Sequence, residues 1–176
     1  MCFGNYEIRY LKESDAASYF QLIQDNKQQL ENYVAGIVSK TKTLADTEAY
    51  VDSLVRSAAA ETHFPYVVAD IRSQELMGYI EVKNIDWNIA KGEIGYFVDK
   101  DLTGKGIGTQ MLQLIAYHYL EELGFLKLLL RIHEDNHSSR KIAGKNGFKV
   151  EGMIRNDYRT GSGHVVHMLY YGKTRD

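Results

Sequence analysis

The chain has 176 residues, 44% of them hydrophobic, and its 21 Lys and Arg residues nearly balance 23 Asp and Glu residues, giving a net charge of −2. This length suits one compact domain, and without a long basic run the sequence argues against a nucleic-acid-binding or membrane-surface protein. The single cysteine, Cys2, excludes an internal disulfide and a multi-cysteine metal site. We therefore expect one domain spanning residues 1–176, in the cytoplasm and with no signal peptide.

In chain order, the predicted elements begin with a strand, two helices and a meander. Residues 6–11 alternate in polarity like a strand, and apolar side chains recur at helical spacing over residues 13–29 and 43–60. Residues 30–37 follow neither period, so we expect a bend there. Three segments rich in Val, Ile, Tyr and Phe predict an antiparallel meander over residues 64–69, 76–82 and 93–98.

The second half predicts a helix, a buried strand, a short helix and a hairpin. Helical spacing starts at Ile107 and ends at Gly124, and the apolar run 126–132 is typical of a strand covered on both faces. Asn136 or Ser138 could cap a helix that reaches Asn146, and residues 148–158 and 164–171 predict a hairpin around the turn RTGSG. This order of elements predicts an α+β (mixed α/β) domain.

Three alternating glycines, Gly104, Gly106 and Gly108, stand between the strand 93–98 and the helix that follows. Free amides and the positive end of a helix dipole attract anions, and glycine lets a ligand approach the backbone closely. Lys105 adds a positive charge. The stretch therefore predicts a phosphate cradle, with a glycine-rich turn that merely starts a helix as the alternative.

The glycine spacing matches neither common nucleotide motif. Asp99 occupies the place of the first P-loop glycine, and Thr109 that of the last glycine in the dinucleotide fingerprint. The stretch instead resembles the signature of the GNAT superfamily of acyl-coenzyme A N-acyltransferases: Arg or Gln, two residues, Gly, one residue, and Gly or Ala. Gly106 and Gly108 match the small positions, whereas Thr103 replaces the usual Arg or Gln.

A second segment strengthens this resemblance. The stretch EDNHSSRKIAGKNGFKVEG is similar to a later family segment through Asn136, Ser139, Asn146, Gly147, Phe148, Glu151 and Gly152. GEIGYFVD and the opening IRYLKESDA resemble the branch that acetylates protein N-termini, typified by ribosomal-protein alanine and serine N-acetyltransferases. The chain has LENYVAGI where that branch usually has a Trp-Leu-Pro-Trp-like segment.

The resemblance implies a mostly antiparallel, twisted sheet that splays between its fourth and fifth strands, here residues 93–98 and 126–133, to admit the pantetheine of acetyl-CoA. The backbones of Phe97 and Val98 would pair with the pantetheine as an added strand does. Asn136 would bind the amide arm, and Lys141 or Lys145 would meet the outer phosphates unless both belong to a solvated helix face. The pyrophosphate would be held by the amides of Gly104, Lys105, Gly106, Ile107, Gly108 and Thr109.

Acetyl transfer to an amine requires a deprotonated nucleophile, a donor for the oxyanion and a stabilised thiolate. By resemblance, the Val98 amide supplies the oxyanion contact and Ser139 lies near the sulfur, although a capping or surface serine would look the same in sequence. Glu93 and Asp157 are the carboxylates placed nearest the acceptor, as base, ammonium ligand or members of a solvated turn. An α-amine, with a pKa of about 7.7–8.0, needs only a weak base, whereas a lysine side chain, with a pKa of about 10.4, is much harder to deprotonate at neutral pH.

Other residues point less clearly to chemistry. His164 and His167 lie three residues apart on a predicted strand and therefore face opposite sides, so we predict no metal. Trp87 and Tyr33 could line an acceptor groove or simply pack in the core.

We therefore expect an acetyl-CoA-dependent N-acetyltransferase that transfers the acetyl group directly and releases coenzyme A. The expected acceptor is the N-terminal α-amine of a protein such as a ribosomal protein. Two alternatives stay open: an acetyltransferase of small-molecule amines, and a non-catalytic acyl-CoA-binding sensor, which the unusual Thr103 favours. The expected partners include no nucleic acid or membrane, and a homodimer is a family-level expectation.

Overall fold

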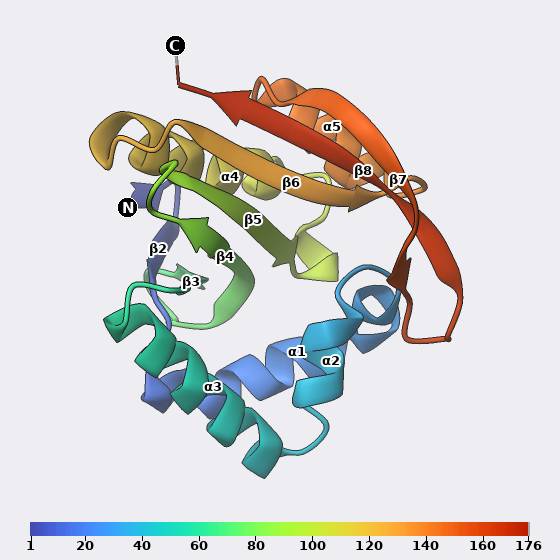
Figure 1. The fold of residues 1–176 in the computed structure, drawn as a ribbon. Coiled ribbons are helices and arrows are strands. Elements are labelled where there is room, and N and C mark those ends of the chain that lie inside the picture. Colours follow the sequence, from blue (N-terminus) through green and yellow to red (C-terminus); the bar gives the residue numbers. More distant parts are fainter. Residues whose placement is uncertain (176) are drawn as a thin grey trace.

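The computed structural model describes residues 1–175 as one eight-stranded sheet with helices on both faces (Figure 1). The strand order is β1-β2-β3-β4-β5-β6-β8-β7, and only β5 and β6 pair in parallel among the described strands. This architecture confirms the α+β (mixed α/β) class. The elements are β1 (Cys2–Phe3), β2 (Tyr6–Tyr10), α1 (Ala16–Tyr33), α2 (Ala35–Lys40), α3 (Leu44–Ala59), β3 (Phe64–Asp70), β4 (Leu76–Asp86), β5 (Lys91–Val98), α4 (Ile107–Tyr117), β6 (Lys127–His133), α5 (His137–Lys145), β7 (Lys149–Arg159) and β8 (Val165–Thr174).

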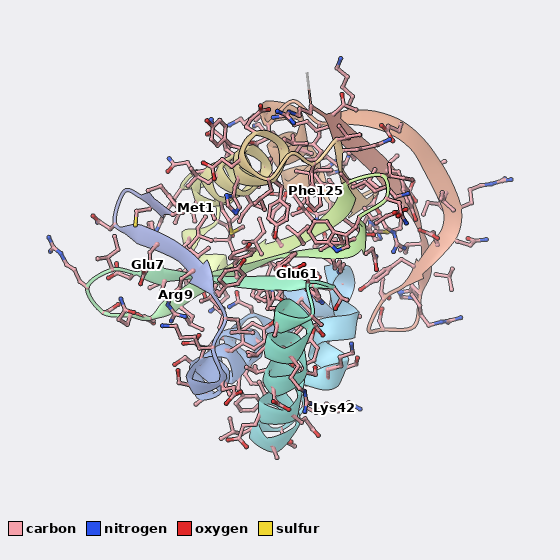
Figure 2. All side chains as sticks on the ribbon, turned by 60° about the vertical axis from the view of Figure 1, so that its left-hand side comes forward. Met1, Glu7, Arg9, Lys42, Glu61 and Phe125 are labelled. Carbon is pink, nitrogen blue, oxygen red and sulfur yellow. The ribbon has the colours of Figure 1, made fainter. Side chains whose placement is uncertain are left out.

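Two cores lie on opposite faces of the sheet. Successive strand residues point to opposite faces, so Val67 packs with α1 and α3 while Val68 packs with α4. Phe125 belongs to the second core, and Figure 2 shows it within the layer of side chains between α4 and the sheet. In residues 1–175, no helix is both long and apolar enough to cross a membrane.

The first helix is longer than its sequence pattern predicts. Leu30 is 1% exposed and continues the buried stripe of α1, which ends at Tyr33 rather than at residue 29. The expected bend is a break at Val34, with α2 starting one residue later. Asn26 interrupts the apolar period, yet it is buried. Its hydrogen bonds offset the cost of burial, because the side chain donates to Asp99 Oδ2 at 2.8 Å and accepts from the Lys100 amide at 2.7 Å.

The predicted strands form, some with longer ends and others with a boundary shifted by one residue. β4 continues to Asp86, β5 begins at Lys91, and the last hairpin forms with β8 between β6 and β7. β7 is therefore an edge strand, which explains why most of its side chains are exposed. His164 lies in the turn before β8 and not on the strand predicted for it.

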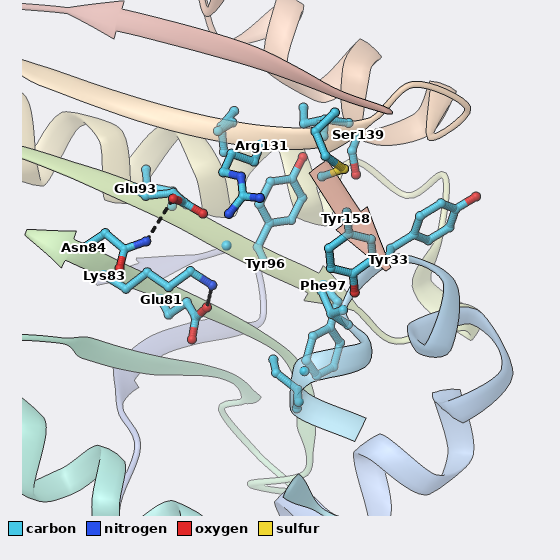
Figure 3. Close-up of a pocket in the computed structure, with 18 of the residues that line it drawn as sticks. Tyr33, Glu81, Lys83, Asn84, Glu93, Tyr96, Phe97, Arg131, Ser139 and Tyr158 are labelled. Carbon is cyan, nitrogen blue, oxygen red and sulfur yellow. Dashed lines mark hydrogen bonds and ion pairs between the residues drawn. The ribbon is translucent and has the colours of Figure 1, made fainter. Parts of the chain in front are cut away.

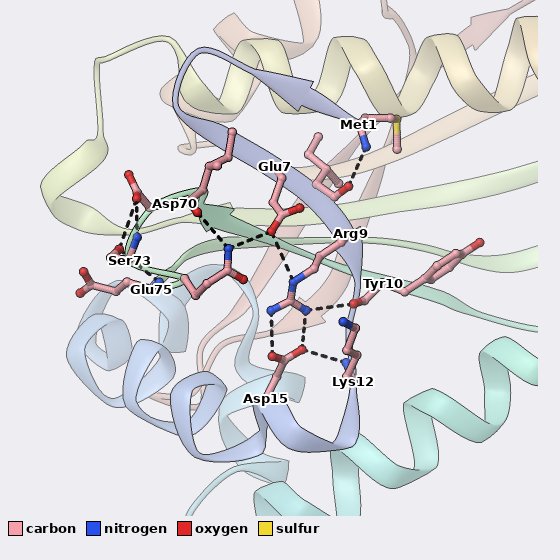
Figure 4. Close-up of polar contacts among 12 residues, drawn as sticks. Met1, Glu7, Arg9, Tyr10, Lys12, Asp15, Asp70, Ser73 and Glu75 are labelled. Carbon is pink, nitrogen blue, oxygen red and sulfur yellow. Dashed lines mark hydrogen bonds and ion pairs between the residues drawn. The ribbon is translucent and has the colours of Figure 1, made fainter.

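Hydrogen bonds fix the corner between β2 and α1 (Figure 4). Arg9 donates from two nitrogens to the Asp15 carboxylate at 2.7 and 2.9 Å, and the Lys12 amide donates to the same carboxylate at 2.9 Å. Burial would raise the pKa of Asp15, but these hydrogen bonds outweigh it and hold the pKa below its usual value. This corner sets the path by which α1 crosses beneath the sheet.

Candidate active site

The sheet splays between β5 and β6. The two strands pair only from Lys91 opposite Lys127 to Ile94 opposite Leu130. Beyond that point, residues 95–98 pair with β4 alone, and residues 131–133 pair with β8 alone. The predicted splay is confirmed, and it leaves one backbone edge of β5 without a strand partner.

A cavity of about 610 Å³ opens beside this free edge. Its walls come from the ends of α1 and β5, the glycine turn and the starts of α4 and α5. Most of the residues named as cofactor ligands from sequence line it: Phe97, Val98, Gly104, Gly106, Ile107, Gly108, Thr109 and Asn136. Lys105 does not line it.

The glycine turn supplies unused backbone donors. Gly104 and Gly106 both have a φ of 83°, a left-handed conformation that favours glycine, and Gly106 is the N-cap of α4. The backbone amides of Gly104, Gly106, Ile107, Gly108 and Thr109 donate to no backbone carbonyl of the described chain. The Lys105 amide, in contrast, donates to Leu102 O at 3.3 Å. The turn therefore presents amides, with the helix dipole behind them, to an anion in the cavity.

Helix α5 begins on the opposite wall of this cavity. Asn136 caps the helix, because its Oδ1 accepts from the Ser139 amide at 3.0 Å. The cap leaves the Asn136 amide nitrogen free to donate. It also fixes the backbone of Ser139 within the first turn of the helix. Lys141 and Lys145 also line the cavity.

A second cavity, of about 530 Å³, lies between β4, β5, β6 and the helices α2 and α3. Figure 3 shows the strands on one side of it and the α1–α2 segment on the other. Six residues line both cavities, so the two meet at a common junction: Tyr33, Val34, Tyr96, Phe97, Asn136 and Ser139.

The two predicted carboxylates lie in different surroundings. Glu93 lines the second cavity, and its Oε2 accepts from Asn84 at 3.0 Å (Figure 3). Asp157 lines neither cavity. Its Oδ2 accepts from Arg131 at 2.8 Å and from Tyr170 at 2.9 Å. The structure therefore brings Glu93 and Ser139 to one cavity and places Asp157 behind Arg131.

A buried ionic cluster in the second cavity was missed at the sequence level. Glu81 is 3% exposed, its carboxylate bonds Tyr79 at 2.8 Å and lies 2.9 Å from His63, and Lys83 pairs with it. Burial would raise the pKa of Glu81, but His63 and Lys83 outweigh it and lower the pKa to about 2. The available signal was a lone carboxylate in the apolar run of β4.

Gly95 keeps this cluster in contact with the cavity. A Cβ at Gly95 would lie 2.9 Å from Glu81 Oε1 and 3.3 Å from Lys83 Nζ. A side chain there would force the Glu81 carboxylate and the Lys83 ammonium to shift, so the close approach favours glycine.

The β7–β8 hairpin closes one side of the second cavity. β7 has a bulge before Tyr158, where Asn156 has a φ of 55°, and the Tyr158 hydroxyl accepts from the Ala35 amide at 2.6 Å. At the hairpin tip, the Gly161 amide donates to Glu31 O at 2.7 Å. These contacts seat the hairpin on the end of α1.

The two aromatic residues that could line an acceptor groove lie in different parts of the structure. Tyr33 lines both cavities and lies edge-on to His133, with ring centroids 5.7 Å apart. Trp87 lines neither cavity, packs against Phe64 and Phe125, and donates from its indole nitrogen to Glu61 O at 3.0 Å. Trp87 is a packing residue of the β4–β5 turn.

The residues present fit an acyl-coenzyme A. The free edge of β5 matches an amide-containing arm, the unused amides match a pyrophosphate, and two lysines on the cavity wall match the charge of outer phosphates. The Ser139 hydroxyl and the buried Tyr96 hydroxyl stand at the junction, where the reacting sulfur would need polar neighbours.

Comparison with known proteins agrees with this geometry. The family model described as acetyltransferase (GNAT) domain matches residues 6–149. The chain is 28% identical over 152 residues to the ribosomal-protein-serine acetyltransferase of Escherichia coli (strain K12), covering 85% of this chain and 82% of that protein.

Solved structures share the fold over nearly the whole chain. Superposition on RimL, a ribosomal L7/L12 alpha-N-protein acetyltransferase in complex with coenzyme A, gives a TM-score of 0.92 at 21% identity, over 99% of this chain and 96% of that one. Superposition on the ribosomal-protein-S5-alanine acetyltransferase of Vibrio fischeri gives a TM-score of 0.90 at 21% identity, over 100% of this chain and 96% of that one.

Proposed function

Because the chain belongs to the GNAT acetyltransferase family and is an acetyl-CoA-dependent N-acetyltransferase, we propose that its acceptor is the N-terminal α-amine of a protein, such as a ribosomal protein. The observation that carries this proposal is the junction between the two cavities. A cofactor on one side and an amine on the other would meet at Tyr96, Phe97 and Ser139.

Acetyl-CoA supplies the acetyl thioester. In the proposal, the backbone edge of residues 95–98 and the amide nitrogen of Asn136 hold its amide arm, and the unused amides of the glycine turn hold its pyrophosphate. Lys141 and Lys145 meet the outer phosphates. The Val98 amide faces the developing oxyanion, and Ser139 Oγ donates to the departing thiolate.

Glu93 is the proposed acceptor-side carboxylate. It lines the second cavity, and only its Oε2 has a hydrogen-bond partner among the described side chains, so Oε1 can receive a proton or bind an ammonium. Asp157 would act through Arg131 instead, because its carboxylate already accepts two hydrogen bonds. A weak base of this kind suits an α-amine better than a lysine side chain.

The names of the relatives support a protein N-terminus as acceptor. The Escherichia coli relative is a ribosomal-protein-serine acetyltransferase, and the coenzyme A-bound structure is an alpha-N-protein acetyltransferase. A ribosomal acceptor would also place the enzyme in the cytoplasm, as the sequence predicts.

Release of free coenzyme A tests the proposal. Purified protein is incubated with acetyl-CoA and a panel of serine- and alanine-starting peptides, the same peptides with blocked N-termini, lysine, amino sugars and polyamines. We expect release with free N-termini and none with blocked ones. Release with small amines alone, or no release with any free N-terminus, would overturn the acceptor class.

The carboxylate assignment has a test of its own. Glu93→Gln should lower kcat/KM about tenfold near neutral pH, with a smaller loss at high pH, where the amine is already neutral. Asp157→Asn should lower it less and leave the shape of the pH profile unchanged. The reverse ranking would assign the proton acceptor to Asp157.

A further inference from the structure

Tyr96 leaves β5 where the two cavities meet and lines both of them. Its hydroxyl oxygen is buried and has no hydrogen bond of regular geometry to any described residue. Buried polar groups are nearly always paired, so an unpaired hydroxyl at this position needs an explanation.

The polar neighbour of the Tyr96 hydroxyl is Ser139. Figure 3 shows the ring of Tyr96 rising from β5 with its hydroxyl directed toward the start of α5, where Ser139 lies. The Asn136 cap fixes the Ser139 backbone, but the Ser139 hydroxyl has no regular hydrogen bond within residues 1–175. Two hydroxyls without regular partners therefore face each other across the junction.

We propose that Tyr96 is a positioning residue for Ser139: its hydroxyl donates to Ser139 Oγ and thereby directs the Ser139 proton into the junction. This inference rests on the proposed function. A serine hydroxyl that accepts one hydrogen bond keeps its own proton to donate, and the accepted bond polarises it for donation. The serine proton then points to where negative charge develops in acetyl transfer.

The protonation state of Tyr96 agrees with a donor role. Burial raises the pKa of Tyr96 to about 12, and the neighbouring Ser139 hydroxyl opposes that shift. Tyr96 therefore stays protonated at neutral pH. It supplies a hydrogen bond and transfers no proton of its own.

Tyr19 is a matched control. Its hydroxyl is also buried without a regular partner, but it packs in the α1–α3 core and lines neither cavity. Its ring lies 5.2 Å from that of Tyr79. Removing the Tyr19 hydroxyl eliminates an unpaired buried group, so Tyr19→Phe should melt at or above the wild-type temperature, whereas Tyr96→Phe loses one hydrogen bond and should melt slightly below it.

The kinetic test compares Tyr96→Phe, Tyr19→Phe, Ser139→Ala and the double variant Tyr96→Phe/Ser139→Ala. We expect Tyr96→Phe to lower kcat about tenfold with the KM for acetyl-CoA within about twofold, and Tyr19→Phe to change neither. In the Ser139→Ala background, Tyr96→Phe should have no further effect. An unchanged kcat for Tyr96→Phe, or additive losses in the double variant, would overturn the proposal.

A measurement without turnover separates this inference from the proposed function. The protein is labelled at tyrosine Cζ with ¹³C, and the Tyr96 resonance is assigned by its loss in Tyr96→Phe. Ser139→Ala should shift this resonance and leave that of Tyr19 in place. An unmoved Tyr96 resonance would overturn the contact even in an active enzyme, whereas a shift in an enzyme inactive on every peptide would leave the contact standing and reject only the acceptor.

Discussion

The corner between β2 and α1 and the cleft between β5 and β6 use polar groups in opposite ways. In the corner, the Asp15 carboxylate accepts three hydrogen bonds from Arg9 and Lys12. In the cleft, one strand edge and five turn amides are left without backbone partners in the described chain. Paired groups contribute stability, whereas unpaired ones remain available to a ligand, so changes in the two regions should affect different measurements.

The largest effect expected in the cleft comes from Ser139→Ala. Loss of the hydrogen-bond donor that stabilises the leaving thiolate should lower kcat about 100-fold, while the KM for acetyl-CoA and the melting temperature change little. Steady-state kinetics measure kcat and KM, and thermal unfolding measures the melting temperature. Ser138→Ala, on the same helix start, is the control and should retain full turnover. A matching loss in both variants would remove Ser139 from the chemistry.

In the corner, Asp15→Asn should act on stability alone. Removing a nearly buried carboxylate paired with Arg9 should lower the free energy of unfolding by about 2 kcal/mol at pH 7 and leave kcat unchanged. The measurement is urea unfolding of both proteins across pH.

The pH dependence of this difference follows from the lowered pKa of Asp15. The native state stabilises the ionised carboxylate, so the contribution is fully present above the usual value of 3.8 and is lost as pH falls through the folded pKa. The gap between wild type and Asp15→Asn should therefore shrink below pH 3.8. A gap that persists in acid would show that packing, and not the charge, stabilises the corner.

Gly106→Ala tests the cradle at the start of α4. The space around a new Cβ is empty, but a φ of 83° is unfavourable for alanine by about 1–2 kcal/mol, so the amides should turn away. We expect the KM for acetyl-CoA to rise about tenfold. Gly144→Ala, in open space within α5 and without a positive φ, should bind normally. Equal KM values for acetyl-CoA in the wild type, Gly106→Ala and Gly144→Ala would argue against the phosphate cradle.

The smallest effect is expected where the β7–β8 hairpin meets the start of α2. Tyr158→Phe removes the hydroxyl that accepts from the Ala35 amide, which should lower the free energy of unfolding by about 1 kcal/mol and raise the KM for the acceptor. Chemical denaturation and peptide kinetics measure these changes. Tyr117→Phe, at an exposed position on α4, should alter neither value. A stable Tyr158→Phe protein with a normal KM would mean that other contacts seat the hairpin.

The sequence by itself determined the features that depend on neighbouring residues. Backbone sterics restrict a φ of 83° largely to glycine, so the alternating glycines already mark the cradle at Gly104 and Gly106. The helix start near Asn136, the meander and the buried strand β6 follow from capping chemistry and side-chain period in the same way, although the structure decided for Asn136 over Ser138 as the cap.

Only the tertiary structure decided the features made by distant segments. The insertion of β8 between β6 and β7 puts Asp157 behind Arg131, and the splay leaves Glu93 facing the second cavity. Glu81 shares its carboxylate with His63, 18 residues away, and Tyr158 reaches Ala35 across 123 residues. Such contacts depend on how strands are ordered and where a bulge turns a side chain, and no local periodicity encodes either.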